Sequence, residues 1–282
     1  MSQVCILTDS TAQFPTPAFA GRKLVNVIPL HVKVNGTLYE KSEGIRAADL
    51  PVSVQPKADL EVLPPNLSEF EDMYAYLGQF YEEIVGIFHT ADLSKTYDNA
   101  VEAAANTQGQ MKIVVIDSLT TATGLGLVVQ TAAAAAEEGV SGPEIDDMIR
   151  SLLPRMYSVF CIQGLSYLHR SKYLGEAQAI VGEFLDVLPI YILESGKLVP
   201  TQKARNNRHL VDLLHEFLSE FTELDHIALL QGTPPFENET RALRERLMED
   251  FDDTPISEHT ISPELATIIG PRSLGMFAMQ SE

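Results

Sequence analysis

The sequence predicts an α/β protein of two domains, the first with a mostly parallel sheet and flanking helices, the second an α/β domain with a mixed sheet. In the first half, short apolar runs alternate with helical patterns. The second half has the same two kinds of pattern and, in addition, the pattern of a hairpin. Strands alternating with helices form parallel sheets through right-handed crossovers, whereas a hairpin joins antiparallel strands. Hydrophobic residues make up 45% of the 282 residues, which supplies a substantial core and argues against disorder.

The elements of the first half follow from these alternating patterns. Short runs rich in Val, Ile and Leu are typical of buried strands, and longer segments with apolar residues three and four apart are typical of helices. The expected strands are 4–7, 25–34, 84–88 and 113–116, and the expected helices are about 69–80, 93–105 and 123–138. The last of these helices is apolar nearly all round, so we expect it to be buried.

The second half starts near Ser141-Gly142-Pro143, with a helix that runs to about Met156. A strand over 157–162 and two helical patterns follow. Further along, the patterns predict a hairpin over 188–203 with its turn at Ser195-Gly196, helices at about 206–221, 238–250 and 263–268, and strands at 226–230, 256–260 and 274–279. We therefore expect one domain over residues 1–155 and the other over residues 156–282.

Charge and composition narrow the function classes. The net charge of −19 argues against binding to nucleic acid or to an anionic membrane surface, because either needs a basic face. No segment approaches about 18 uninterrupted apolar residues, so stable membrane insertion is not expected. Cys5 and Cys161 each lie in an apolar run and are expected to be core thiols. The N-terminus has no pattern of a signal peptide, and we expect a cytoplasmic protein without a disulfide scaffold.

Polar residues follow three of the expected strands at the point where each strand ends. They are residues 8–10 (Thr-Asp-Ser), 89–90 (His-Thr) and 117–118 (Asp-Ser). Ligands of open parallel sheets bind beyond the carboxyl ends of the strands. The sequence therefore predicts a binding site at this edge.

The segment from Phe88 to Ala100 carries the most specific sequence signal at that edge. It leads from a strand into a helix and places two hydroxyl groups, Ser94 and Thr96, at the helix start. Unpaired N–H groups at a helix start, together with hydroxyls, can bind an anion, and a carboxylate suits them as well as a phosphate does. The alternative is ordinary helix capping, which stabilises by about 1 kcal/mol.

The residues from Ser94 to Tyr97 resemble the Ser-Gly-Thr-Tyr motif of the DegV family, bacterial proteins that bind a long-chain fatty acid. The stretch that begins at Asp117 resembles the family's Asp-Ser motif, and the segment 165–175 resembles its Leu-x-Tyr-Leu segment. Arg205 matches the family's arginine after a hairpin in the second domain. The resemblance covers nearly the whole chain in order, from residues 8–10 to Gly270-Pro271.

The resemblance implies a lipid carrier without catalysis of its own. One fatty acid of the palmitate or stearate class would lie in a buried apolar tunnel and be the only bound group. A separate ATP-dependent fatty acid kinase subunit would phosphorylate the carboxyl group. Ser94 and Thr96, with Ser118, would orient this group, and Arg205 would face the kinase.

The chain departs from the family pattern around the head-group site. Lys95 replaces the glycine of the motif, and it either neutralises the carboxylate or crowds it. Val62 stands where the family's Thr-Ser-Gln-Pro has its threonine, and Ile268 replaces a histidine, while Arg272 replaces a glycine. Because an unpaired buried charge is costly, these changes leave open a lipid with a different or less polar head group.

Two other classes compete with a lipid carrier. His89, Asp117 and Ser94 would make a catalytic triad if they met in space, which keeps a Ser-dependent acyl hydrolase as an alternative. A nucleotide-binding module is disfavoured because Gly124-x-Gly126 lacks the third glycine of a dinucleotide fingerprint and no phosphate-binding loop is present. The seven histidines show no metal-ligand spacing.

Overall fold

The computed structural model describes residues 4–55, 57–107 and 111–281, which form two compact units. Unit 1 comprises Met1–His31, Leu63–Pro154 and Ser195–Lys197, and unit 2 comprises Val32–Val62, Arg155–Glu194 and Leu198–Glu282. Both units are thus discontinuous in the sequence. The two continuous domains expected, 1–155 and 156–282, stay a prediction.

The described chain contains strands, α-helices and short 3-10 helices in alternation. The strands are β1 (Val4–Asp9), β2 (Val25–Ile28), β3 (His31–Val34), β4 (Thr37–Tyr39), β5 (Leu60–Leu63), β6 (Glu83–Phe88), β7 (Lys112–Asp117), β8 (Met156–Ile162), β9 (Leu188–Glu194), β10 (Lys197–Ala204), β11 (Leu224–Gln231), β12 (Ile256–Thr260) and β13 (Ser273–Gln280). The α-helices are α1 (Leu67–Leu77), α2 (Thr96–Asn106), α3 (Ala122–Glu137), α4 (Gly142–Leu152), α5 (Leu165–Arg170), α6 (Glu176–Phe184), α7 (Asn207–Ser219), α8 (Glu237–Asp250) and α9 (Pro263–Ile269). The 3-10 helices are η1 (Arg22–Leu24), η2 (Glu40–Ser42), η3 (Ala47–Asp49) and η4 (Leu153–Arg155).

Unit 1 is built on a parallel sheet with the strand order β2-β1-β6-β7. Strands β1 and β6 are buried along their whole length, as expected for apolar runs covered on both faces. The register pairs Thr8 with Ile87 and Phe88 with Asp117, so β1, β6 and β7 end at one edge.

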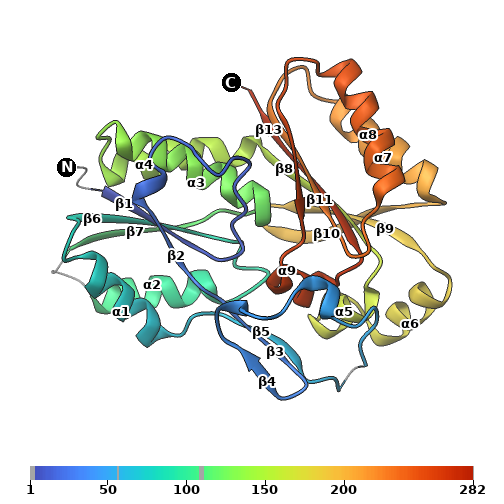
Figure 1. Ribbon diagram of the computed structural model, residues 1–282, viewed down its shortest axis with the longest axis horizontal. Helices are drawn as coiled ribbons and strands as arrows, with labels where there is room; N and C mark the ends of the chain where they lie inside the picture. Colours follow the sequence, from blue (N-terminus) through green and yellow to red (C-terminus); the bar gives the residue numbers. More distant parts are fainter. Residues whose placement is uncertain (1–3, 56, 108–110, 282) are drawn as a thin grey trace. The chain divides into compact units, whose positions relative to one another are not determined.

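Helices cover both faces of this sheet, with α1 and α2 on one face and α3 and α4 on the other (Figure 1). Cys5 and Leu7 of β1 pack with Phe70 and Tyr74 of α1 and with Ala100 of α2 in one buried cluster. The starts of two helices are set by local signals. Asn66 and Glu69 form a capping box at α1, and Ser141 and Glu144 form one at α4.

Helix α3 is buried over most of its length, in agreement with its apolar sequence. A Cβ atom at Gly126 would lie 2.0 Å from the carbonyl oxygen of Gln13, and the N–H of Gln13 donates to the carbonyl of Ala122. Gly126 therefore permits close packing of the chain on the first turns of α3. The glycine at position 126 is therefore explained by packing, without a nucleotide.

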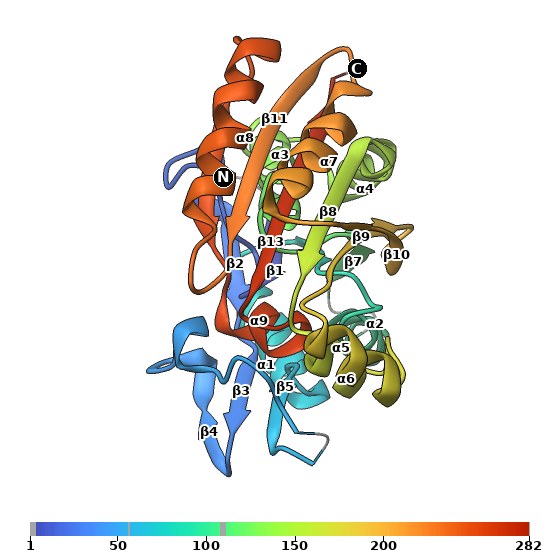
Figure 2. The same cartoon turned by 90° about the vertical axis from the view of Figure 1, so that its right-hand side faces the viewer.

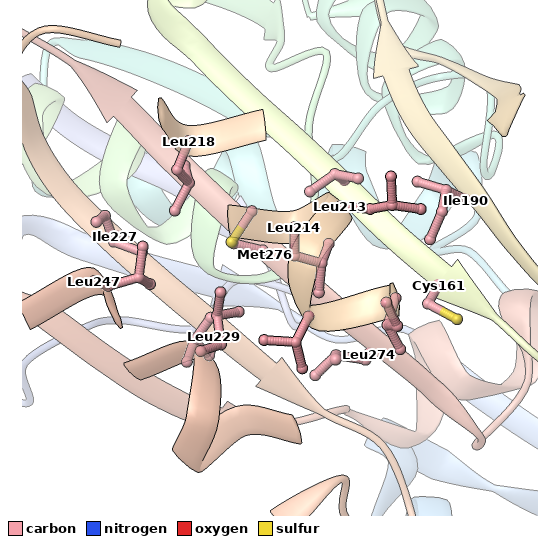
Figure 3. Close-up of a cluster of buried hydrophobic side chains, with 14 of the residues drawn as sticks. Cys161, Ile190, Leu213, Leu214, Leu218, Ile227, Leu229, Leu247, Leu274 and Met276 are labelled. Carbon is pink, nitrogen blue, oxygen red and sulfur yellow. The ribbon is translucent and has the colours of Figure 1, made fainter. Parts of the chain in front are cut away.

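Unit 2 is built on a mixed six-stranded sheet with the order β10-β9-β8-β13-β11-β12 (Figure 2). Strands β11 and β12 are parallel, whereas the pairs β11–β13, β13–β8 and β8–β9 are antiparallel. Helices α7 and α8 contribute leucines, such as Leu214 and Leu247, to an apolar cluster on one face of the sheet (Figure 3). This sheet and the parallel sheet of unit 1 confirm the expected α/β class.

One expected strand is wrong. The run 25–34 is not a single strand, because β2 ends at Ile28 in the parallel sheet and β3 starts at His31 in a three-stranded sheet of order β4-β3-β5. Pro29 lies at the break, and proline has no N–H for a strand ladder. Apolar composition alone does not reveal such a change of sheet.

The structure bears on three expectations, which concern the cysteines, membrane insertion and metal ligands. Cys5 and Cys161 are buried free thiols, and burial raises the pKa of each to about 12. Among the described residues, no helix has the length and apolar character to cross a membrane. The same part of the chain holds no group of three His, Cys, Asp or Glu side chains suited to a metal ion.

Candidate functional site

The polar ends of β1 and β6 are joined through one carboxylate. Asp9 Oδ1 accepts hydrogen bonds from the N–H (2.9 Å) and the hydroxyl (2.6 Å) of Thr11, and Asp9 Oδ2 accepts from the N–H of His89 (2.8 Å). All three residues are fully buried. The Asp9 carboxylate therefore holds the backbone at the carboxyl edge of the sheet.

Asp117 has the same role at the end of β7. Its carboxylate accepts from the N–H groups of Leu119 (2.9 Å) and Ala91 (3.3 Å). Burial raises the pKa of the Asp117 carboxyl group, although these two N–H groups and nearby His89 oppose the shift. Asp9 and Asp117 thus both accept hydrogen bonds from backbone N–H groups of the loops that follow the strands.

Ser118 lies at this edge, but its hydroxyl is used within its own loop. Its Oγ donates to the carbonyl oxygen of Thr120 (3.2 Å), and the N–H of Thr120 donates back to Oγ (3.4 Å). The N–H of Ser118 donates to the carbonyl of Phe88, which ties β7 to the end of β6. Ser118 is only 1% exposed.

Ser94 is the centre of a hydrogen-bond network at the start of α2, referred to below as the Ser94 network. Its Oγ shares hydrogen bonds with His89 Nε2 (2.6 Å) and with Thr96 Oγ1 (2.7 Å), and it accepts from the N–H of Thr96 (3.1 Å). His89 and Thr96 are fully buried, whereas Ser94 is partly exposed. The network thus combines the two expected hydroxyls with a histidine from the end of β6.

The neighbours of Ser94 determine where its proton can point. The Thr96 N–H can only donate, and both His89 Nε2 and Thr96 Oγ1 are able to donate to the same oxygen. A serine hydroxyl oxygen has two lone pairs, so with the Thr96 N–H on one of them only one of these two groups can donate to the other. When His89 Nε2 donates, the Ser94 proton points to Thr96 Oγ1, and it can turn from there to an anion. Ser94 therefore accepts from the first N–H of α2 and is also a suitable donor to an anion.

Several buried polar atoms around this edge have no hydrogen-bond partner among the described residues. They are His89 Nδ1 and the hydroxyls of Thr8, Thr121 and Thr123. Thr8 follows Leu7 in β1, so its side chain points to the sheet face opposite α1 and α2, the face on which α3 contacts β1. Buried polar groups without partners are rare and cost about 1–3 kcal/mol each, which marks this region as unusual.

The residues of the alternative catalytic triad do not form one. The Ser94–His89 hydrogen bond is present, but neither Asp9 nor Asp117 is hydrogen-bonded to the imidazole, and His89 Nδ1 has no partner within the described chain. A triad needs a carboxylate on that nitrogen to orient the histidine. The geometry therefore gives a serine–histidine pair without its acid.

The remaining predicted residues are exposed or belong to unit 2. Lys95 is the N-cap residue of α2, and its side chain is exposed. Val62 is half-buried in β5, and Ile268 is buried in α9, where its carbonyl accepts from Ser171 Oγ (3.0 Å). Arg205 is exposed before α7, and no described carboxylate forms an ion pair with its guanidinium.

Sequence reasoning found the edge of the sheet but missed part of its chemistry. Thr8 and His89 belong to the predicted edge, but the sequence does not indicate that His89 bonds to Ser94, and it gives Thr121 and Thr123 no role. A usable signal was present for Thr121 and Thr123, because two threonines flank the start of an otherwise apolar helix.

An open parallel sheet with hydroxyls, a histidine and a helix start at its carboxyl edge defines an α/β protein with a candidate ligand site at that edge. A family model described as "Uncharacterised protein, DegV family" matches residues 3–281. The chain belongs to the DegV family, as the Ser94 segment predicted.

Known relatives agree with this assignment. A DegV domain-containing protein from Caldanaerobacter subterraneus is 26% identical over 281 residues, which are 98% of this chain and 99% of that protein. The structure is similar to that of a Thermus thermophilus DegV family protein described under "fatty acid binding" (TM-score 0.81, 24% identity, 99% and 100% of the two chains). It is also similar to the Streptococcus pneumoniae Fatty Acid Kinase (Fak) B3 protein loaded with linoleic acid (TM-score 0.80, 18% identity, 99% and 100%).

Proposed function

We propose that this chain binds a long-chain fatty acid and presents its carboxyl group to a separate ATP-dependent fatty acid kinase. The Ser94 network carries the proposal, because it offers an O–H donor at a helix start, where an anion is favoured. Membership of the DegV family supports it, as do the fatty acids named for the Thermus and pneumococcal proteins.

The head group would be held mainly by hydrogen bonds. Ser94 donates its proton to one carboxylate oxygen, while His89 Nε2 and the Thr96 N–H both donate to Ser94 Oγ. Hydrogen bonds to a charged group contribute about 1.5–3 kcal/mol, more than neutral ones. Thr96 sets the position of Ser94, and Ser118 shapes the adjoining loop rather than donating directly.

The hydrocarbon tail would supply most of the affinity. Each methylene buried in an apolar tunnel contributes about 0.8 kcal/mol, so a chain of the palmitate or stearate class gains more than immobilisation removes. The polar atoms at the sheet edge would then select and orient the head group. They would contribute less to overall affinity than the tail.

In this proposal the kinase supplies the catalysis, and this chain needs no catalytic base. The chain would act in the cytoplasm as a substrate carrier. The pneumococcal relative is named as a fatty acid kinase B protein, which supports a kinase partner. Arg205 would face that partner, because its exposed guanidinium has no ion pair among the described residues and suits an anionic group.

Val62 and Ile268 favour a second candidate, a carrier for a lipid with a less polar head group. Both are apolar where the family motifs have a threonine and a histidine. Fewer polar contacts lower the stability of a buried carboxylate more than that of an ester or an alcohol.

Lipid extraction from the purified full-length chain, followed by mass spectrometry, tests the proposal. We expect a free fatty acid of about 16–18 carbons. The Ser94→Ala variant should retain at least about tenfold less of it, since one hydrogen bond to a charged group is lost. Ser141→Ala is the matched control, because it removes a capping serine elsewhere in unit 1 and should retain the lipid.

An ester or alcohol as the extracted lipid would replace the fatty acid proposal by the second candidate. Equal retention by Ser94→Ala and the unchanged chain would remove Ser94 from head-group binding. Turnover of acyl esters that depends on Ser94 would instead identify a hydrolase, which the missing acid on His89 argues against.

The kinase step is tested separately with a purified fatty acid kinase. Arg205→Ala should leave lipid retention unchanged and lower acyl phosphate formation. Arg208→Ala is the matched control, because Arg208 is also exposed and lies three residues away in α7. Unchanged transfer by Arg205→Ala would exclude this arginine from the partner contact.

A further inference from the structure

A polar cavity lies within unit 2 and shares no residue with the Ser94 network. It has a volume of about 200 Å³ and is lined by the chain at Ser53, the end of β8 at Gln163, the C-terminal part of α6, the loop residue Asp186 and Arg272 before β13. A cavity of this size is below the range of about 300–1,000 Å³ typical for drug-sized ligands. It therefore suits a small polar group and not an acyl chain.

Two opposite charges line this cavity without neutralising each other. The guanidinium of Arg272 has no ion pair or hydrogen bond among the described residues, and only the carbonyl of Arg272 is engaged, by the N–H of Gln163 (3.1 Å). The carboxylate of Asp186 is equally without a partner in the described part of unit 2, although both side chains line one cavity. Asp186 is exposed and Arg272 is partly buried, so both charged groups are available to a ligand.

The third charge of the cavity is already used. Glu183 accepts from the N–H of Ser166 (2.7 Å) through Oε1 and from the hydroxyl of Ser53 (2.8 Å) through Oε2. The Ser166 hydroxyl in turn accepts from the N–H of Val54 (3.1 Å). These bonds join α6 to α5 and to the segment at Ser53 and Val54, which fixes one wall of the cavity.

We propose that this cavity binds a small zwitterion, with a phosphate or carboxylate on Arg272 and an ammonium group on Asp186. A guanidinium fits such an oxyanion in a two-pronged arrangement, and the aspartate accepts from the ammonium. A lone anion would be repelled by the two carboxylates, and a lone cation would be repelled by Arg272. A ligand with both charges pairs with both residues, which makes the zwitterion the favoured class.

The ligand chemistry has two sources, a free small molecule or the head group of a zwitterionic lipid. Both carry an oxyanion and an ammonium group a few bonds apart. None of the residues that line the cavity belongs to the Ser94 network, so the two proposals are tested by different variants.

O-phosphoethanolamine is the probe for a calorimetric titration of the full-length chain. We expect it to bind at least about tenfold more tightly than inorganic phosphate or ethanolamine alone, because each of these loses one charged contact. Arg272→Gln and Asp186→Asn should each weaken binding by at least about tenfold. Asparagine is chosen because Asp186 has a positive φ of 49°, a conformation that asparagine also tolerates.

Arg150→Gln is the control, because Arg150 pairs with Asp146 in unit 1 and should not affect the titration. Unchanged thermal unfolding shows that the variants are folded. No binding of O-phosphoethanolamine by the unchanged chain, or equal binding by Arg272→Gln, would overturn the proposal. Equal affinity for phosphate alone would also overturn it, in favour of a simple anion site.

Vesicles distinguish the two sources of the zwitterion once binding is seen. Association with phosphatidylethanolamine vesicles, but not with phosphatidylglycerol vesicles, that is lost in Arg272→Gln would identify a lipid head group. Binding of the free probe without vesicle association would identify a soluble zwitterion.

Discussion

The apolar cluster under α7 and α8 in unit 2 and the carboxyl edge of the parallel sheet in unit 1 are both buried, but they differ in what they bury. The cluster consists of side chains such as Leu214, Leu229 and Met276, which fill space and make no hydrogen bonds (Figure 3). The edge buries Asp9, His89 and several hydroxyls, some of them without partners in the described chain. The first arrangement is the stable solution for a core, whereas the second lowers stability unless a ligand uses it.

We therefore expect residues of the cluster to hold the fold and residues of the edge to serve binding. Substitutions in the cluster should then change the free energy of unfolding and leave lipid retention unchanged. Substitutions at the edge should change lipid retention, and removal of an unpaired hydroxyl there should raise the free energy of unfolding rather than lower it.

The largest effect is expected for Leu229→Ala. Leu229 is fully buried in β11, and removing its methyl groups leaves a cavity that lowers the free energy of unfolding by about 2–5 kcal/mol. Urea unfolding measures this loss. Lipid extraction well below the unfolding temperature should show unchanged retention, and reduced retention would mean that the cluster also takes part in binding.

A change of pH is expected to act on the opposite face of the same strand. Burial, with a contribution from nearby His259, lowers the pKa of His226 to about 4 from its ordinary value of 6.5. The unfolded chain thus binds this proton below about pH 6.5 while the folded chain does not. The free energy of unfolding should fall by about 2 kcal/mol between pH 7 and pH 5 through this group.

His226→Gln tests that assignment, because glutamine keeps a polar group near Ser257, the partner of His226 Nε2 at 2.8 Å. Its unfolding free energy should depend less on pH over the same range. An unchanged pH dependence would mean that a group other than His226 titrates in this range.

Much of the fold was predictable because strand and helix periods are local. The α7 and α8 helices and the hairpin of β9 and β10 lie within two residues of their expected bounds, since apolar spacing and the turn at Ser195-Gly196 determine them. The change of sheet at Pro29 was not predictable in the same way. It depends on which strands pair, and pairing is a long-range property.

The site was predictable in its location but only partly in its chemistry. Ser94 and Thr96 share a hydrogen bond because both lie within three residues at one helix start. The role of His89 depends on the path of the chain between β6 and α2, which brings its Nε2 to Ser94. The roles proposed for Val62, Ile268 and Arg205 stay predictions, because they follow from the family pattern alone.

A smaller effect of opposite sign is expected for Thr8→Val. The Thr8 hydroxyl is buried and has no partner among the described residues, so an isosteric methyl group should raise the free energy of unfolding by about 1 kcal/mol. Thr107→Val is the matched control, since the Thr107 hydroxyl donates to the carbonyl of Ala103 (2.8 Å) and its loss should lower stability. Lower stability of the Thr8→Val variant in lipid-free protein would show that the Thr8 hydroxyl has a hydrogen-bond partner, contrary to our expectation for the edge.

The smallest effect is expected for Lys95→Gly, which introduces the glycine of the family motif at the N-cap of α2. The Lys95 side chain is exposed, so it does not crowd the buried Thr96, and its ammonium group acts on a carboxylate only through solvent. Exposed charge pairs contribute about 0.2–1 kcal/mol, and salt screens them. Fatty acid retention measured by competition with a fluorescent fatty acid should weaken by about two- to fivefold at low salt and by less at high salt. Tighter retention by Lys95→Gly would instead mean that the lysine stem crowds the head group, and the edge would then be more tightly packed than its unpaired hydroxyls indicate.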